Sequence, residues 1–109
     1  MISYFVRYRG SADDPAGFVD YYATWHVAIL KEFPRIRGLS LHQLVDWSDP
    51  FPVSPDGTSL LAQMTFDTLA DLQRALHSEA RRHARDDFAR FPSFSGDVTH
   101  QAMSRKIIF

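Results

Sequence analysis

Two side chains that can transfer protons, Tyr22 and His26, lie four residues apart in the first third of the chain. Residues at this spacing share one side of a helix, so both rings can act on one substrate. The imidazole titrates near neutral pH, and the phenol can orient it or hydrogen-bond a substrate oxygen. We therefore predict that His26 and Tyr22 are catalytic. In the competing structural interpretation, His26 is a boundary histidine satisfied by a backbone carbonyl or by Tyr22.

A further histidine, His42, shares one face of a predicted strand with Asp46, and roughly 13 Å of strand separates them, which prevents contact. If that face lies under the helices, His42 joins His26 in a shared cavity and binds substrate. If it is the opposite face, His42 lies in a dimer interface or in solvent. The alternation leaves both placements open and favours neither metal binding nor direct pairing.

The remaining histidines are not spaced by the three or four helical residues that present two ligands to one metal; they are His77, His83 and His100. We expect no metal site. The charged residues between positions 81 and 87 predict a solvated helix face with mixed-sign pairs. The chain has no glycine-rich phosphate loop and no GxSxG element, so nucleotide and serine-hydrolase chemistry are not expected.

The helix that positions Tyr22 and His26 is predicted from residue 15 to about residue 32. Asp14 provides an N-cap, and Pro15 is suited to the first helical position. At about 100° per residue, the apolar side chains gather in one narrow arc; they are Phe18, Tyr22, Trp25, Ile29 and Phe33. This arc is expected to form core, so truncating Trp25 should cost about 3–5 kcal/mol.

The other elements follow from alternation and turn signals. Strands are predicted at residues 2–9, 36–47, 60–66 and 98–109. A second helix is expected after residue 67 or 68, broken near Ser78 and continuing through Phe88. The order βαββαβ predicts one α+β domain over residues 1–109, with a ferredoxin-like, four-stranded antiparallel sheet and both helices on one face. The other face is expected to carry alternating apolar residues from all four strands, which a partner subunit covers.

The segment from residue 48 to residue 57 is longer than an ordinary hairpin connection and contains three prolines. Prolines restrict the unbound conformations of a loop, which suits a segment that docks on another surface. We predict that it packs over a partner subunit or over the mouth of the cavity, with Phe51 as the apolar anchor. The alternative is a surface loop with an exposed phenylalanine.

Composition narrows the class of partner. The 12 Lys and Arg residues nearly balance the 13 Asp and Glu residues, so neither nucleic acid nor an anionic membrane is an expected partner. There is no cysteine, and no signal peptide or membrane span is recognisable, so we expect a cytoplasmic protein. Aromatic residues make up 14% of the chain, which indicates a second buried surface, either a partner or a ligand cavity.

The segment FVDYYATWH, residues 18–26, resembles the EthD family pattern of a phenylalanine, an aromatic pair and a histidine. In this chain Tyr22 and His26 occupy the last two places. The segment FPRIRGL, residues 33–39, looks like the family's approach to its second strand, and Phe88 like its closing aromatic residue. Two departures are Ala28, where the family usually has proline, and Tyr22, where tryptophan is common.

The resemblance implies a homodimeric α+β barrel, a fold shared with muconolactone isomerases and cofactor-free quinol oxygenases. It does not define an activity. We expect a small hydrophobic or aromatic, oxygen-bearing compound to be isomerised or cleaved by acid–base chemistry without a cofactor, in a degradative or biosynthetic pathway. The predicted substrate-binding residues are Phe18, Trp25, Ile29, His42 and Phe88.

Three alternatives remain open. The protein can be a small-molecule binding or accessory protein without turnover, since the same aromatic cavity would serve that role. It can be a cofactor-free monooxygenase if its substrate itself activates oxygen. A haem role, found in some related barrels, would need one axial histidine, for which His83 is the candidate.

Overall fold

A computed structural model describes all residues from 1 to 109. Four strands form one antiparallel sheet in the order β2-β3-β1-β4. The strands are β1 (Ile2–Ala12), β2 (Gly38–Gln43), β3 (Thr58–Phe66) and β4 (Phe94–Ser104). The helical segments are α1 (Pro15–Tyr21), the π-helical η1 (Tyr22–His26), α2 (Val27–Leu30), α3 (Leu69–Leu76), α4 (Glu79–Asp87) and the 3₁₀ turn η2 (Phe88–Arg90). The predicted α+β, ferredoxin-like fold is therefore confirmed.

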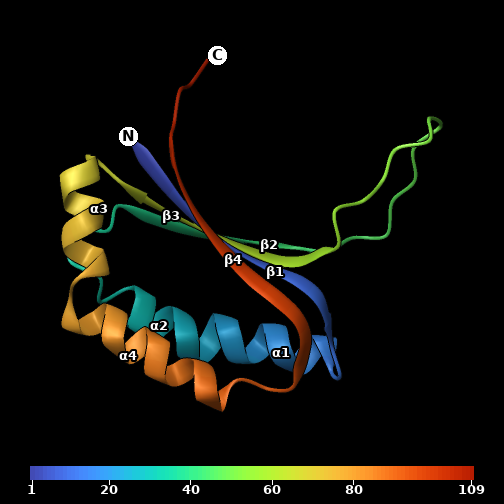
Figure 1. The fold of residues 1–109 in the computed structure, drawn as a ribbon, viewed down its shortest axis with the longest axis horizontal. Helices are drawn as coiled ribbons and strands as arrows, with labels where there is room; N and C mark the ends of the chain where they lie inside the picture. The colour runs from blue at the N-terminus through green and yellow to red at the C-terminus, as the bar shows by residue number, and fades with distance from the viewer.

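All helices cover one face of the sheet, and the opposite face is bare (Figure 1). The core lies between these two layers. Every second residue of the central strands is buried there, as the period of a strand requires; they are Tyr4, Val6 and Tyr8 of β1 and Leu60, Ala62, Met64 and Phe66 of β3. Because β1 and β3 are the inner strands, they supply most of the sheet's share of the core.

The first helix is not a regular α-helix, and this changes which side chains it buries. Its middle turn is π-helical, and the backbone N–H of Val27 donates to the carbonyl of Tyr22, five residues back. The wider turn accommodates one extra residue, so every later position is displaced around the axis. The buried residues are consequently four apart, namely Phe18, Tyr22, His26 and Leu30.

The prediction that Trp25 belongs to the core is therefore wrong. Its side chain is 64% exposed. Continuing at about 100° per residue placed Trp25 and Ile29 inward. The π turn instead directs His26 and Leu30 inward, and Ile29 is half-buried.

Helix caps agree with the sequence. The Asp14 side chain accepts a hydrogen bond from the Gly17 N–H, and Thr68 and Ser78 cap α3 and α4 in the same manner. The predicted break of the second helix near Ser78 is thus confirmed. It allows α4 to turn and pack against α2, while α3 packs on β1 and β3.

All four strands differ in their bounds from the prediction, and β2 and β4 differ most. β2 ends at Gln43 instead of extending to residue 47, and β4 runs from Phe94 to Ser104 instead of from 98 to 109. The early start of β4 depends on a glycine pair, because Gly10 of β1 lies opposite Gly96 of β4. A Cβ on Gly96 would lie 1.8 Å from the Arg9 carbonyl oxygen, and its φ is +147°. Only glycine fits there.

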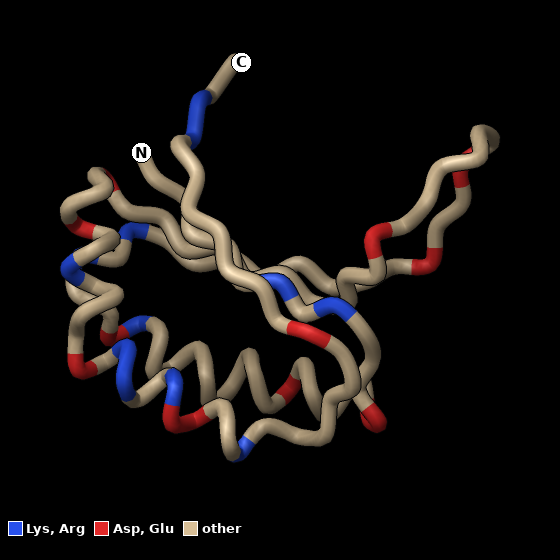
Figure 2. The backbone as a smooth tube through the Cα atoms, viewed as in Figure 1, with Lys and Arg blue, Asp and Glu red and all other residues tan.

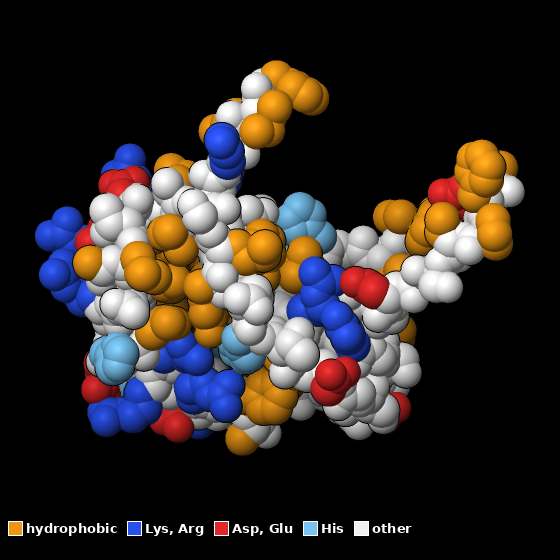
Figure 3. Space-filling model, turned by 45° about the horizontal axis from the view of Figure 1, so that its top comes forward, with side chains coloured by type: hydrophobic (Ala, Val, Ile, Leu, Met, Phe, Trp, Pro, Cys, Tyr) orange, Lys and Arg blue, Asp and Glu red, His pale blue; other side chains and the backbone are white.

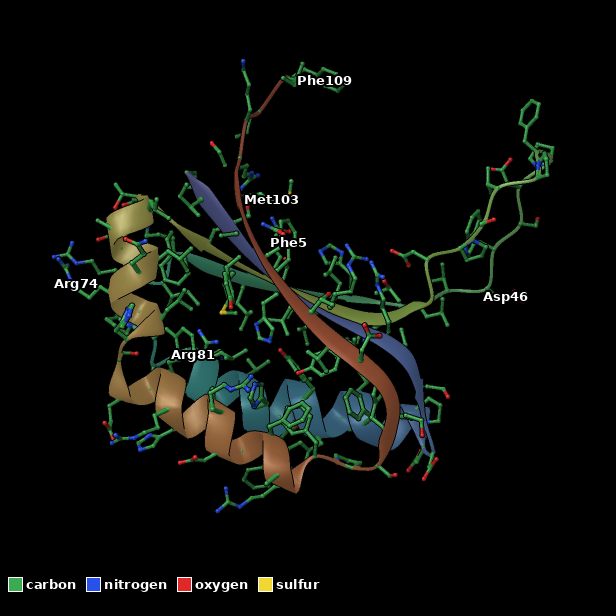
Figure 4. The ribbon with its side chains drawn as sticks, viewed as in Figure 1. Phe5, Asp46, Arg74, Arg81, Met103 and Phe109 are labelled. Atoms are coloured by element: carbon green, nitrogen blue, oxygen red, sulfur yellow. The ribbon has the colours of Figure 1, made fainter.

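The bare face of the sheet is less apolar than the sequence predicts. Its apolar side chains are Phe5, Leu61 and Met103, and Figure 4 shows Phe5 and Met103 on the side away from the helices. The β2 strand contributes Ser40 and His42, both exposed and polar. The expectation of apolar residues from all four strands is corrected, since β2 supplies none.

Two segments project from the body of the molecule. Residues 44–57, which connect β2 to β3 and include Asp46, extend beyond the end of the sheet, and residues 105–109 continue past β4 (Figures 1 and 4). Both carry exposed hydrophobic side chains, which Figure 3 shows at their outer ends. Phe51 is 74% exposed and lies on the projecting part of its loop. Within one chain, the loop therefore does not cover the cavity mouth, contrary to one of the two predicted placements.

Candidate functional site

A cavity of about 410 Å³ lies between the sheet and the helical layer. Its apolar wall comes from β1, η1, α2 and β3, and its polar groups come from η1, α4 and β4. The lining residues are Tyr4, Val6, Tyr8, Tyr22, His26, Leu30, Phe33, Met64, Arg81, Ala84, Arg85, Phe88, Gly96, Val98 and His100. The volume is within the range of small-molecule sites, toward its lower end, so it suits a compact ligand.

His26 is held at one wall of this cavity by a buried carboxylate. Its Nδ1 lies 2.9 Å from Oδ2 of Asp87, and the Tyr21 hydroxyl donates to Oδ1 of the same carboxylate at 2.7 Å. Only 6% of His26 and 5% of Asp87 is exposed. Nδ1 is therefore the protonated nitrogen, because a carboxylate accepts.

The other ring nitrogen of His26 is free to act on a ligand. Nε2 has no hydrogen-bond partner in the protein. Because no unpaired polar side-chain atom is fully buried, Nε2 must be accessible. Because His26 also lines the cavity, Nε2 has access to it. Burial lowers the pKa of His26, and this outweighs the opposing effect of Asp87. The ring is thus a neutral base near pH 7.

Two phenols, Tyr8 and Tyr22, lie beside His26 in the cavity wall. Tyr22 is 1% exposed, its ring lies 4.8 Å from that of His26, and it meets the Tyr8 ring edge-on. Burial raises the pKa of both hydroxyls, and the neighbouring Tyr8 hydroxyl raises that of Tyr22 further. Both remain protonated at neutral pH and can donate a hydrogen bond to a ligand oxygen.

An aromatic cluster holds these rings in place. Phe91, which follows η2, contacts the rings of Tyr8, Tyr22 and His26, with centroids 6.2, 5.8 and 4.7 Å away. The His26 contact is edge-to-face, a favoured aromatic geometry. The sequence contained no signal for this role, because Phe91 lies outside every predicted element.

The opposite wall carries a second histidine, His100 of β4. Its Nδ1 lies 2.9 Å from the Tyr4 hydroxyl, and the Arg81 guanidinium lies 5.9 Å from the centre of the Tyr4 ring. Arg81 rises from α4 toward the strands in Figure 4. Partial desolvation lowers the pKa of His100, and the positive charges of Arg81 and Arg85 lower it further. This wall is positively charged, whereas the His26 wall contains a carboxylate.

The structure brings together some of the predicted site residues and separates others. Tyr22, His26 and Phe88 line the cavity, whereas Phe18 lines two neighbouring depressions. Trp25 and Ile29 do not line it, because the π turn rotates them away. His42 does not line it either, since its partner Leu61 is on the bare face. The predicted placement of these three residues at the substrate is corrected.

Several residues that face the cavity or support its groups were not predicted as such, among them Tyr4, Tyr8, Arg81, Arg85, Asp87 and His100. Alternation could have found His100, because it is two residues from the apolar Val98 and so shares its face. Asp87 was indistinguishable from its charged neighbours. Only the packing of α4 against the first helix buries this carboxylate and not Asp86.

Nothing in the chain gathers into a metal site. No three side chains of the His, Asp and Glu types are arranged to hold one ion, and His26 and His100 lie on different walls of the cavity. His83 is exposed and lies near Glu79, outside the cavity.

None of the helices has the length and apolar character needed to cross a membrane.

The fold and cavity define a ferredoxin-like α+β protein with an internal aromatic site. No family model matches the chain. One curated relative, an uncharacterized 11.0 kDa protein from the thcB–thcC intergenic region of Rhodococcus erythropolis, is 29% identical over 86 residues. The match covers 79% of this chain and 78% of the relative.

Solved structures confirm that the fold is EthD-like. An EthD family protein from Bacillus halodurans aligns with a TM-score of 0.75 at 17% identity, over 97% of this chain and 100% of that one. A dimeric ferredoxin-like protein of unknown function from Thermobifida fusca aligns at 0.67 and 10% identity, covering 95% and 90%. The cofactor-independent oxygenase SnoaB from Streptomyces nogalater aligns at 0.63 and 14% identity, covering 98% and 95%. These similarities concern the fold alone.

Proposed function

We propose that the protein is an EthD-like enzyme that moves a proton on a small aromatic or alicyclic, oxygen-bearing compound bound in this cavity. The observation that carries the proposal is the His26–Asp87 pair beside two protonated phenols. A buried histidine oriented by a carboxylate, with its second nitrogen facing a cavity, is the arrangement of a general base. The proposed chemistry requires no cofactor.

In the proposed reaction, Nε2 of His26 takes a proton from a carbon next to the substrate carbonyl. The electron pair of the broken C–H bond forms an enolate, and the Tyr22 hydroxyl, with Tyr8 nearby, donates a hydrogen bond to its oxygen. The Asp87 carboxylate stabilises the imidazolium formed on His26. Return of the proton to a different carbon completes an isomerisation, and loss of a neighbouring leaving group completes a lyase reaction.

The main alternative is a binding or accessory protein without turnover. It predicts that the cavity holds its ligand but that His26 transfers no proton. Similarity to a cofactor-independent oxygenase also supports the third candidate function, a cofactor-free monooxygenase in which a substrate carbanion reacts with oxygen. That reaction would begin with the same proton removal, so the first experiment concerns that step.

The test uses 2-tetralone in D₂O and follows exchange of its acidic C1 protons by NMR. We expect wild-type protein to accelerate the exchange, His26→Gln to lose about 100-fold or more of that acceleration, and Tyr22→Phe to lose about tenfold. His83→Gln is the matched control, because it changes an exposed histidine of α4 that does not line the cavity. Circular dichroism checks that each variant is folded.

Saturation-transfer NMR on the same samples separates the alternatives. Binding of 2-tetralone without accelerated exchange would support a binding protein without turnover and contradict the proposed role of His26 as a base. Equal acceleration by wild type and His26→Gln would remove His26 from the mechanism.

We also propose that the chain forms a homodimer through its bare sheet face. The mixture of apolar and polar side chains there resembles the average composition of a protein interface. The two projecting segments support this arrangement, since residues 44–57 carry acidic but no basic side chains, and residues 105–109 carry Arg105 and Lys106 (Figure 2). Opposite charge beside exposed hydrophobic groups suits contact between the loop of one copy and the tail of the other.

Sedimentation of wild-type protein at micromolar concentration should give the mass of a dimer. Replacing residues 49–56 with a short Gly-containing turn should weaken dimerisation, since it removes Phe51 and Val53. A wild-type monomer would contradict the proposal. An unchanged dimer with the shortened loop would assign the loop to connection alone.

A further inference from the structure

Two arginines of α4, Arg81 and Arg85, line the mouth of the cavity one helical turn apart. Neither forms an ion pair with any carboxylate. Of the acidic groups on the same helix, Glu79 pairs with Arg82 and Asp87 binds His26 and Tyr21, while Asp86 is exposed and forms an ion pair with neither Arg81 nor Arg85. Two uncompensated positive charges therefore face a cavity in a chain whose formal net charge is −1.

We propose that the ligand of this cavity is a carboxylate whose anionic group is held at the mouth by Arg81 and Arg85, with its ring between the aromatic and aliphatic walls. This inference rests on the proposed function and adds the chemical class of the substrate.

The geometry of the mouth suits a planar anion. A guanidinium presents paired N–H donors that match the two oxygens of a carboxylate. Arg81 is half-buried and lies near the Tyr4 ring, so its side chain is partly ordered before a ligand arrives. Gly96 and Val98 of β4 line the same space without adding a polar side chain. The arginines are thus the charged groups that select what enters.

The depth of the cavity accounts for the remainder of the ligand. Beyond the arginines the wall is largely apolar, with Leu30, Phe33 and Met64 among its buried members. His26, also buried, is the group placed to act on the ring or its substituents. A carboxylate at the mouth would orient such a compound in one direction, because its reversal would bury an unpaired charge.

Arginines also occur on solvated helix faces, and Arg82 is an example of such an arginine. It is exposed, paired with Glu79, and absent from the cavity lining. Arg81 and Arg85 differ from it because neither forms an ion pair and both line the cavity. Arg82 is therefore a matched control on the same helix.

The experiment measures the affinity of the full-length chain for 2-naphthoate and for 2-naphthalenemethanol by isothermal titration calorimetry. These compounds share a ring system and differ in charge. We expect wild type to bind the carboxylate about tenfold or more tightly than the alcohol, because hydrogen bonds to charged groups are the stronger ones. Arg81→Gln and Arg85→Gln should each reduce carboxylate affinity several-fold and leave alcohol affinity unchanged. Arg82→Gln should alter neither.

Ionic strength gives an independent readout, since raising salt should weaken carboxylate binding and leave the alcohol unaffected. Equal wild-type affinity for the two compounds, or a preference that survives Arg81→Gln and Arg85→Gln, would overturn this inference while leaving the proposed function intact. Failure of both compounds to bind would overturn the ligand cavity and, with it, the anion preference.

Discussion

The two histidines of the cavity differ in burial and in the charge of their neighbours. His26 is enclosed and bonded to the Asp87 carboxylate, whereas His100 is more exposed and faces Arg81 and Arg85. Both have a lowered pKa, but for different combinations of reasons. Burial acts against a favourable carboxylate at His26, and partial desolvation acts together with unfavourable arginines at His100.

This contrast indicates different roles for the two rings. A neutral base must become positively charged when it takes a proton, and a neighbouring carboxylate stabilises that state. His26 has this neighbour. Protonation of His100 would instead add a third positive charge beside two arginines. His100 is thus better suited to hydrogen bonding while neutral, and the cavity divides into a proton-accepting wall and an anion-binding wall.

Removal of the Asp87 carboxylate should have the largest effect on the free energy of unfolding. Asp87→Ala leaves both the His26 Nδ1–H and the Tyr21 hydroxyl without an acceptor, and we expect a loss of about 2–3 kcal/mol in the free energy of unfolding. The pKa of His26 should fall further, because Asp87 raises it. Urea denaturation and an NMR titration of the His26 ring measure the two effects. Asp87→Asn, which keeps one acceptor oxygen, should be milder; stability equal to wild type in both variants would contradict the contribution assigned to this carboxylate.

The next largest effect should be on the pH dependence of stability, to which both histidines contribute. Each has a folded-state pKa below the ordinary value of 6.5, so the unfolded chain binds more protons than the folded one in that window. The free energy of unfolding should therefore decrease as pH falls below 6.5 and level off once both folded-state groups are protonated. Urea midpoints at several pH values measure this.

Single substitutions assign that pH dependence. His26→Gln and His100→Gln should each remove part of it, because each removes one of the two groups whose folded-state pKa is lowered. His83→Gln is the exposed control on the helical side of the molecule and should leave the profile unchanged. A profile left unchanged by either substitution would contradict the contribution assigned to that histidine.

The arginines should affect one histidine and not the other. Arg81→Gln and Arg85→Gln should each raise the pKa of His100, because each removes a positive charge that opposes its protonation. The pKa of His26 is expected to change little, since its named influences are burial and Asp87. NMR titration of both rings in one sample makes the comparison directly. Equal movement of both values would mean that the two walls share one electrostatic environment.

The smallest effect is expected at Trp25, next in sequence to His26 but outside both walls. Trp25→Ala should change the free energy of unfolding of the monomer by no more than about 0.5 kcal/mol, because the side chain is 64% exposed. Chemical denaturation at low protein concentration measures this. A cost of about 3 kcal/mol or more would restore the core position that regular helical periodicity predicts.

Local patterns in the chain were sufficient for the architecture. Alternation along β1 and β3, the caps at Asp14 and Ser78, and the element order predicted the sheet, the helix break and the ferredoxin-like topology. They were sufficient because strand period and helix capping depend on neighbours in the sequence. The Tyr22–His26 pair was also found this way, since a spacing of four holds in an α-helix and in the wider turn that occurs here.

Tertiary structure decided the rest of the site. The π turn exchanged Trp25 for His26 on the inner side, which no rule based on a constant rotation per residue could anticipate. The partnership of His26 with Asp87 joins residues 61 positions apart, and that of Tyr4 with His100 joins residues 96 apart. Such contacts arise only when α4 and β4 close over the first helix and the first strand, because packing, and not local preference, determines which charged side chains of a helix are buried.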